Sequence, residues 1–387
     1  MPTPLLSLLL DRVRAEGPIT VAQFVAEALY HEEFGYYSSE QQRSGRSGDF
    51  FTSVDLGPVF GELLAGQFAE MWDLWRGAPG TTERVSVDLV ESAAGNGRLA
   101  RDVLDFAEQH DPAFYRAIRL HLVERSPRAR ERQRETLARH ASRLAGSSPD
   151  LPDRVSGIIY ANELLDALPP HLVVMRDGGL REVYVGEQPQ GAGRLRTLEG
   201  PLSSPRIAEY LDRVGARLEA GWHAEVNLAA DDWVRDAAAR LQRGFLVLID
   251  YGHDATRLYS ASHAGGTLTS YRRHASESRE DGPGWLLEPG ERDITSHVDL
   301  TGIVLAGQEA GLEWLGTVDQ TYFLLALGLA DQAFQDAGTR PDDLKRRLAL
   351  KTLLLPGGIG STHKVVVFSK SIGAASLRGL SRGGRVT

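Results

Sequence analysis

The sequence predicts a doubly wound α/β fold, in which parallel strands are connected by helices. Short β-branched runs occur at residues 85–90, 121–124 and 157–162, and helical stretches separate them. This alternation of strand and helix is typical of a parallel sheet with crossover helices. Apolar runs of the same kind return at residues 244–250 and 363–368. The predicted sheet therefore draws its strands from a large part of the chain.

The first part of the chain has helical periodicity instead. Apolar residues recur every three or four positions after Thr20, a residue type that caps helices well, and again over residues 60–72. A glycine- and serine-rich segment, residues 44–53, separates these helices and has the composition of an exposed loop. We expect residues 1–80 to form a helical N-terminal cap that carries this loop.

The predicted sheet begins after the cap and is interrupted once. Residues 172–227 break the alternation, because they contain a hairpin, a polar loop and a helix. We expect this region to be an insertion that binds substrate. The core of the fold then comprises residues 81–171 and 228–370, and residues 371–387 are expected to form a flexible tail.

Composition excludes several classes of function. The chain has no cysteine, which excludes disulfides, cysteine-ligated zinc and thiol nucleophiles. Its 52 acidic residues outnumber its 43 basic residues, which argues against nucleic acid as a partner. The eleven histidines form no HxxxH or HxH pair, so no metal site is expected. No apolar run of membrane-spanning length occurs, and we expect a cytoplasmic protein without a membrane partner.

The strongest local motif is the segment after the strand at 85–90. The strand ends at Glu91, and the turn that follows contains Ala93, Gly95 and Gly97 before a helix begins. Glycines let the backbone approach a ligand, and a helix N-terminus offers free N–H groups, so the layout favours a nucleotide-type cofactor site. It differs from the GxGxxG pattern of dinucleotide enzymes, which makes a NAD-dependent dehydrogenase the more remote alternative. An ordinary strand–helix turn would look the same in isolation.

Two further segments place polar groups at the ends of predicted strands. Glu124 ends the next strand and could accept hydrogen bonds from both ribose hydroxyls, although a solvated carboxylate is the alternative. Asn162, Glu163 and Asp166 follow the strand at 157–162, where open α/β sheets bind their ligands. The two acids are three residues apart and could share one face of a helical turn. A helix cap at Asn162 with exposed acids is the alternative there.

Two later clusters each combine acids with a histidine. They are Asp250–His253 and Asp293–Asp299, and the second contains His297. Each could supply a general base or fix a substrate, and each could equally be a structural hydrogen-bond network.

Taken in order, these segments resemble the MidA-like class I methyltransferases, a family that includes the mitochondrial arginine methyltransferase of complex I assembly. The resemblance spans roughly residues 19–368. The matching segments are Gly48–Ser53 with Phe60–Glu62, Glu91 with Gly95 and Gly97, Glu124–Pro127, Asn162–Pro169, Asp250–Gly252 and Asp293–Asp299.

The resemblance implies a Rossmann-like methyltransferase with S-adenosyl-L-methionine as cofactor and a protein arginine as the methyl acceptor. The residues that it assigns to the cofactor are Gly48, Asp49, Thr52, Ser53, Glu91, Ala93, Gly95, Gly97, Glu124, Arg125 and Asn162. The residues expected at methyl transfer are Asn162, Glu163, Asp166 and His297. A guanidinium group forks toward carboxylates, so Glu163 and Asp166 are expected to clamp an arginine.

This sequence departs from the family at the glycine turn, where Ala93 replaces a glycine and needs a permitted backbone conformation. Three functions remain open at this point: a protein arginine methyltransferase, a methyltransferase for a small molecule or peptide natural product, and a non-catalytic assembly factor. The first two would differ in the binding region formed by the insertion. The oligomeric state, including a homodimer, is also open.

Overall fold

The computed structural model describes residues 3–38, 53–77, 86–189, 193–271, 283–329, 352–353 and 362–381. The chain divides into two compact units. Unit 1 contains Met1–Phe51, Leu165–Trp233 and Gly252–Leu305, and unit 2 contains Thr52–Leu164, Val234–Tyr251 and Ala306–Thr387. Within the described residues, no helix has both the length and the apolar character needed to cross a membrane.

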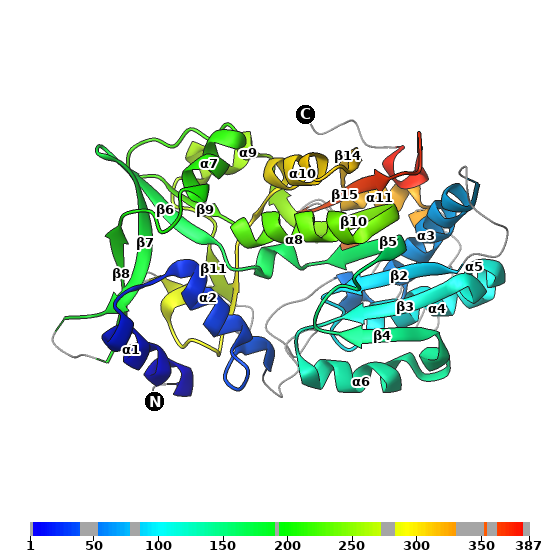
Figure 1. Ribbon diagram of the computed structural model, residues 1–387, viewed down its shortest axis with the longest axis horizontal. Helices are drawn as coiled ribbons and strands as arrows, with labels where there is room; N and C mark the ends of the chain where they lie inside the picture. Colours follow the sequence, from blue (N-terminus) through cyan, green and yellow to red (C-terminus); the bar gives the residue numbers. More distant parts are fainter. Residues whose placement is uncertain are drawn as a thin grey trace. The chain divides into compact units, whose positions relative to one another are not determined.

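Unit 2 is built around a sheet with the strand order β14-β15-β10-β5-β2-β3-β4. Neighbouring strands from β10 to β4 pair in parallel, whereas β15 runs antiparallel to both β10 and β14. Figure 1 shows β10, β5, β2, β3 and β4 side by side. The strands are β2 (Val87–Ser92), β3 (Ile118–Val123), β4 (Leu144–Ser148), β5 (Val155–Asn162), β10 (Leu241–His253), β14 (Glu313–Asp319) and β15 (His363–Lys370). The predicted doubly wound α/β class is confirmed.

Helices precede or connect the strands of unit 2. They are α3 (Val59–Gly77), α4 (Arg98–His110), α5 (Pro112–Ala117), α6 (Pro127–Leu137) and α11 (Gln320–Ala326), with α8 (Leu228–Arg240) and α10 (Leu300–Glu309) beginning in unit 1. Phe68 of α3 packs on Tyr160 of β5, with 4.9 Å between ring centroids. Helices α3 and α4 approach so closely that a Cβ on Gly61 would lie 2.7 Å from the Cβ of Asp102. The apolar face predicted over residues 60–72 therefore packs in the core of unit 2.

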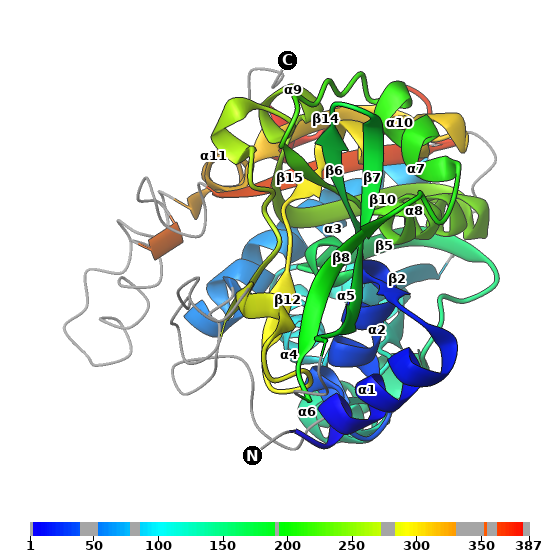
Figure 2. The same cartoon turned by 90° about the vertical axis from the view of Figure 1, so that its left-hand side faces the viewer.

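Unit 1 contains a second, smaller sheet. Its order is β1-β7-β6-β9, with β8 paired to β7. Strands β6, β7 and β8 can be followed in Figure 2. The strands are β1 (Ile19–Thr20), β6 (His171–Arg176), β7 (Gly179–Glu187), β8 (Leu195–Gly200) and β9 (His223–Val226), and the helices are α1 (Pro4–Glu16), α2 (Val21–Tyr30), α7 (Arg206–Arg213) and α9 (Ala255–Leu258). Thr20 caps α2 in a capping box with Gln23, as its position predicts. The predicted hairpin is β6–β7, which pairs in antiparallel register.

Three short strands complete unit 1. They are β11 (Thr269–Tyr271), β12 (Asp293–Thr295) and β13 (Val298–Asp299). Strands β11 and β12 pair with each other, and β13 pairs in parallel with the last two residues of β10, Gly252 and His253. The segment Asp293–Asp299, singled out in the sequence, is therefore two strands joined by Ser296 and His297.

The two units divide the chain differently from the boundaries expected from the sequence. Helix α3 was assigned to the N-terminal cap but belongs to unit 2, and residues 252–305 were assigned to the core but belong to unit 1. The end of the chain was expected to be a flexible tail. At residues 378 and 379 the backbone is held to α3, because the N–H of Arg378 donates to Glu70 and the N–H of Gly379 donates to Gln67. Residues 382–387 of the expected tail lie outside the described residues. Long-range pairing, which local periodicity does not report, decides these boundaries.

Candidate active site

The turn between β2 and α4 has an unusual backbone. Gly95 and Gly97 have φ angles of 50° and 85°, in the left-handed region that glycine adopts without strain. Ala93 has a φ of 56°, which costs an L-residue about 1–2 kcal/mol. The turn therefore keeps the conformation that glycine would favour at position 93, at an energetic cost to the folded state.

Glu124, one residue beyond β3, lies against this turn. Its Oε2 accepts a hydrogen bond of 2.9 Å from the Gly95 N–H, and its Oε1 accepts one of 2.8 Å from the Ser126 N–H. Gln133 of α6, which is fully buried, donates to the Gly95 carbonyl over 2.9 Å. The structure thus brings together the glycine turn and the carboxylate that the sequence places at the ribose.

Glu91 lies in the interior of unit 2 and is only 4% exposed. Its carboxyl accepts a 3.0 Å hydrogen bond from the Tyr160 hydroxyl on the neighbouring strand β5. Burial raises the pKa of Glu91 from 4.5 to about 8, and the nearby charges of Asp102 and Glu124 act in the same direction. At neutral pH this acid is therefore protonated, and its hydrogen bond with Tyr160 is one between neutral groups.

Asn162 ends β5 and Glu163 follows it, on the side of β2 opposite to β3. The Asn162 side-chain amide donates to Glu163 Oε1 over 3.2 Å. Glu163 has a φ of 53°, a left-handed conformation that is rare outside glycine. Its own N–H donates to the Ile249 carbonyl over 2.8 Å, which ties this turn to β10. Strained non-glycine residues concentrate at functional sites, so this turn is a strong candidate.

Two further residues lie against this turn: Asp250, which the sequence places in an acid–histidine cluster, and His363, which was not singled out in the sequence. Asp250, which is 3% exposed, accepts a 3.1 Å hydrogen bond from the Leu164 N–H through Oδ2 and a 2.9 Å bond from the Tyr251 N–H through Oδ1. His363 begins β15, and its Nε2 lies 3.6 Å from Glu163 Oε1. Because β15 is antiparallel, its first residue lies at the edge where the parallel strands end. The position of His363 beside Glu163 therefore follows from the antiparallel direction of β15, which the sequence does not report.

The loop predicted to cover the cofactor is described only at its end. Gly48, Asp49 and Thr52 lie outside the described residues. The Ser53 hydroxyl is fully buried and accepts a 3.0 Å hydrogen bond from Gln320 Nε2. Asp55, in the 3-10 helix Ser53–Leu56, forms an ion pair with Arg98 at the start of α4. The end of the loop is thus held at α4, the helix that follows the glycine turn. Arg125, which was also predicted to contact the cofactor, is exposed.

Asp166 and His297 belong to unit 1, whereas Asn162 and Glu163 belong to unit 2. Asp166 Oδ2 accepts a 2.7 Å hydrogen bond from the Thr295 hydroxyl, and the Asp166 carbonyl accepts the Ser296 N–H over 3.2 Å. The His297 N–H donates to the Thr267 hydroxyl over 3.0 Å. Burial lowers the pKa of His297 below 6.5, and the neighbouring His263 lowers it further.

The polar atoms at the carboxyl edge of unit 2 fit a nucleoside ligand. Ser92 at the end of β2 pairs with Val123 on β3 and with Ala161 on β5, so Glu124 and Asn162 flank it. Two strand spacings of about 4.8 Å separate them by roughly 10 Å, the scale of a nucleoside. Ser92 Oγ and Asn162 Oδ1 are buried and lack a hydrogen-bond partner among the described residues. Buried polar atoms of this kind are usually satisfied by a ligand or water.

Sequence relatives of this chain are methyltransferases. Residues 63–318 match the family model described as "Putative S-adenosyl-L-methionine-dependent methyltransferase". The "Protein arginine methyltransferase NDUFAF7, mitochondrial" of Mus musculus is 30% identical over 351 residues, which cover 84% of this chain and 74% of that protein. The Homo sapiens protein of the same name is 30% identical with the same coverage.

A solved structure agrees with this relationship. A "likely methyl transferase" from Burkholderia thailandensis, crystallised with S-adenosyl-homocysteine, has a TM-score of 0.85 and 30% sequence identity, and the match covers 100% of this chain and 98% of that one. A native crystal structure from the same organism has a TM-score of 0.83 at 28% identity. The class I fold, the methyltransferase activity and S-adenosylmethionine as cofactor are thereby confirmed. The chain belongs to this family of S-adenosyl-L-methionine-dependent methyltransferases.

Proposed function

We propose that this methyltransferase transfers its methyl group to an arginine nitrogen of a protein. One observation carries the proposal. The glycine turn extends from the carboxyl end of β2. Glu124 lies beside it at the end of β3, and Asn162 and Glu163 lie on its other side at the end of β5. The curated relatives with 30% identity are named protein arginine methyltransferases, which supports arginine as the acceptor.

The residues at the turn after β2 are the ones that we propose to hold the cofactor. The Glu124 carboxylate, kept in place by the Gly95 and Ser126 N–H groups, would accept hydrogen bonds from the two ribose hydroxyls. Ser92 and Asn162 would supply buried acceptors nearby. When bound, S-adenosylmethionine supplies an electrophilic methyl group on a cationic sulfur.

Glu163 is the residue that we propose to orient the acceptor. A guanidinium group is cationic and binds carboxylates through parallel N–H bonds, so the Glu163 carboxylate would align one nitrogen for in-line attack. A bond then forms between that nitrogen and the methyl carbon, the bond from carbon to sulfur breaks, and its electron pair stays on sulfur. The methylated nitrogen loses one proton, for which the Glu163 carboxylate is the proposed acceptor.

Asp166 and His297 remain predictions in this scheme. Asp166 was expected to be the second carboxylate of the arginine clamp, and one of its oxygens accepts the Thr295 hydroxyl. His297 was expected at methyl transfer, where it could supply a general base or fix the substrate. A cytoplasmic location and a homodimer also remain predictions, and the curated relatives are named as mitochondrial proteins.

Two variants test the proposal separately for cofactor and acceptor. Glu124→Ala should abolish binding of S-adenosylhomocysteine in calorimetry. Glu163→Gln should bind S-adenosylhomocysteine as the wild type does and lose about 100-fold or more in methyl transfer. Exposed Glu131 on α6 offers a matched control, and Glu131→Gln should behave as the wild type does.

The acceptor is measured with labelled methyl groups on arginine-containing proteins and on the same proteins with lysine in place of arginine. Label on the arginine proteins alone supports the proposal. Label only in the small-molecule fraction of a lysate would favour the alternative of a small-molecule methyltransferase. Cofactor binding without any transfer would favour a non-catalytic assembly factor.

A further inference from the structure

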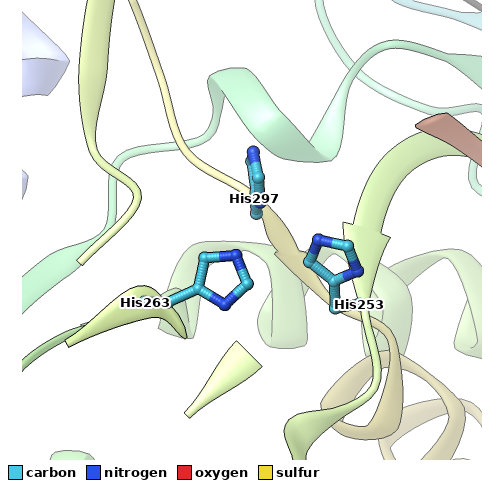
Figure 3. A group of neighbouring side chains, drawn as sticks. All are labelled: His253, His263 and His297. Carbon is cyan, nitrogen blue, oxygen red and sulfur yellow. The ribbon is translucent and has the colours of Figure 1, made fainter. Parts of the chain in front are cut away.

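Three histidines from separate segments of unit 1 lie close together. His253 ends β10, His263 ends the 3-10 helix Ala261–His263, and His297 lies in the link between β12 and β13. One ring nitrogen from each residue lies within 4.8 Å of the corresponding nitrogens of the other two. Figure 3 shows the three imidazole rings grouped around a common space. From this arrangement we propose that His253, His263 and His297 form a binding site for a divalent transition metal, zinc(II) in the first instance.

The geometry suits an imidazole-ligated ion. The ring centroids are separated by 5.2 Å for His253 and His263, 5.3 Å for His253 and His297, and 5.8 Å for His263 and His297. A tetrahedral zinc ion with bonds of 2.0–2.1 Å to nitrogen requires about 3.3 Å between its ligand atoms. Closing the remaining gap needs a shift of roughly 1.5 Å in the separation of the ligand atoms, which rotation of the side chains can supply. Such a displacement does not require the backbone to move.

The surroundings of His263 fix the tautomer that a metal ligand needs. His263 Nδ1 lies 3.0 Å from the Arg257 carbonyl oxygen. A carbonyl oxygen only accepts, so Nδ1 carries the proton in this hydrogen bond and Nε2 carries the lone pair. Metal-binding histidines commonly donate their second ring N–H to a backbone carbonyl in this way.

The backbone around the other two histidines is held by strand pairing. His253 pairs with Asp299 where β10 and β13 run in parallel, and the His297 N–H donates to the Thr267 hydroxyl over 3.0 Å. These bonds fix the Cα positions from which the rings extend. A site that needs only side-chain rotation is largely preformed. This favours metal affinity, because binding then costs little conformational entropy.

The ligand set indicates which ion would bind. Imidazole nitrogens favour zinc, copper and nickel over magnesium and calcium, which prefer oxygen. Among the described residues, the group contains three histidines and no carboxylate or thiol. The fourth position of a tetrahedral ion would then be open to water. The sequence predicts no metal site because these three histidines form no HxxxH or HxH pair. The site does not depend on the methyltransferase assignment.

Direct metal binding tests the site on the full-length chain without an affinity tag. Zinc chloride titrated into metal-free protein should bind at one equivalent per chain, and cobalt(II) should give the intense visible absorption of a tetrahedral site. His263→Ala should weaken zinc affinity by about 100-fold and abolish the cobalt spectrum. His110→Ala, an exposed histidine at the end of α4, is the matched control and should change neither.

A folding control separates loss of the site from loss of the fold. His263→Ala should still bind S-adenosylhomocysteine, and a second variant, His253→Gln, should repeat the loss of zinc. Stoichiometric zinc binding that both variants abolish supports the site. Absence of saturable zinc binding in the wild type, or zinc binding that both variants retain, would overturn it. The arginine proposal is tested separately by methyl transfer, and zinc bound at His297 would exclude that residue as a general base.

Discussion

Glu91, the buried acid of β2, should make the free energy of unfolding depend on pH, and one substitution should remove its contribution. Burial raises the pKa of Glu91 from 4.5 to about 8. In the unfolded chain this carboxyl ionises above its ordinary pKa, whereas in the folded protein it keeps its proton up to the raised value. Between these pH values the folded state holds one more proton, so its stability falls as pH rises. The stabilisation from Glu91 is fully present below the pKa that the carboxyl has in the unfolded chain. It is lost as the pH rises through the pKa that the carboxyl has in the folded protein.

The size of the effect follows from the shift. Each pH unit in this window changes the free energy of unfolding by about 1.4 kcal/mol, so two units change it by about 3 kcal/mol. Glu91→Gln removes this dependence, because glutamine is neutral at every pH and its carbonyl can still accept the Tyr160 hydroxyl bond. The variant should therefore gain about 3 kcal/mol relative to the wild type between pH 5.5 and 7.5.

Thermal unfolding of the two proteins at pH 5.5, 6.5 and 7.5 measures this difference. Since 1 kcal/mol shifts the Tm of a domain of this size by about 2–4 °C, the Tm difference should change by roughly 6–12 °C across the range. Glu131→Gln, at an exposed position on α6, should show no such change. A Tm difference between wild type and Glu91→Gln that stays constant over the three pH values would refute the reasoning.

Two further predictions concern the turns at the site. Ala93→Gly should raise the free energy of unfolding by up to about 1 kcal/mol and leave affinity for S-adenosylhomocysteine equal or higher, since glycine adopts the left-handed conformation without strain. The control is the neighbouring Ala94→Gly, at a buried position without positive φ, which should lower stability by about 1 kcal/mol. Denaturant titration measures the stability of both variants, and equal effects of the two substitutions would contradict this account. Asp250→Ala should cost about 2–4 kcal/mol of stability, because it leaves the N–H groups of Leu164 and Tyr251 without their acceptor, and should lower kcat far more than it weakens binding of S-adenosylhomocysteine. Asp250→Asn keeps a carbonyl acceptor for one of the two N–H groups and should recover part of both losses. A fall in binding that matches the fall in kcat would contradict the positioning role.

Local patterns in the sequence were sufficient for the fold class and for the grouping of the glycine turn with Glu124. Thr20 signals the start of a helix because its side chain caps the adjacent backbone, and the β-branched runs signal strands because their pattern is local. Gly95, Gly97 and Glu124 could be grouped because consecutive parallel strands carry their carboxyl ends to the same edge. These features depend on residues near one another in the chain or on a topology rule.

Only the tertiary structure revealed the contacts that depend on the direction of a strand and on the side of the sheet to which a side chain points. The Glu91 carboxyl accepts a hydrogen bond from Tyr160 on the neighbouring strand, a contact that spacing in the sequence does not report. His363 reaches Glu163 because β15 runs antiparallel, and Asp250 reaches the Leu164 N–H because β10 pairs with β5. The clustering of the three histidines has the same origin. Each of these contacts joins segments far apart in sequence, and their proximity is set by packing of the whole chain, which spacing along the sequence does not record.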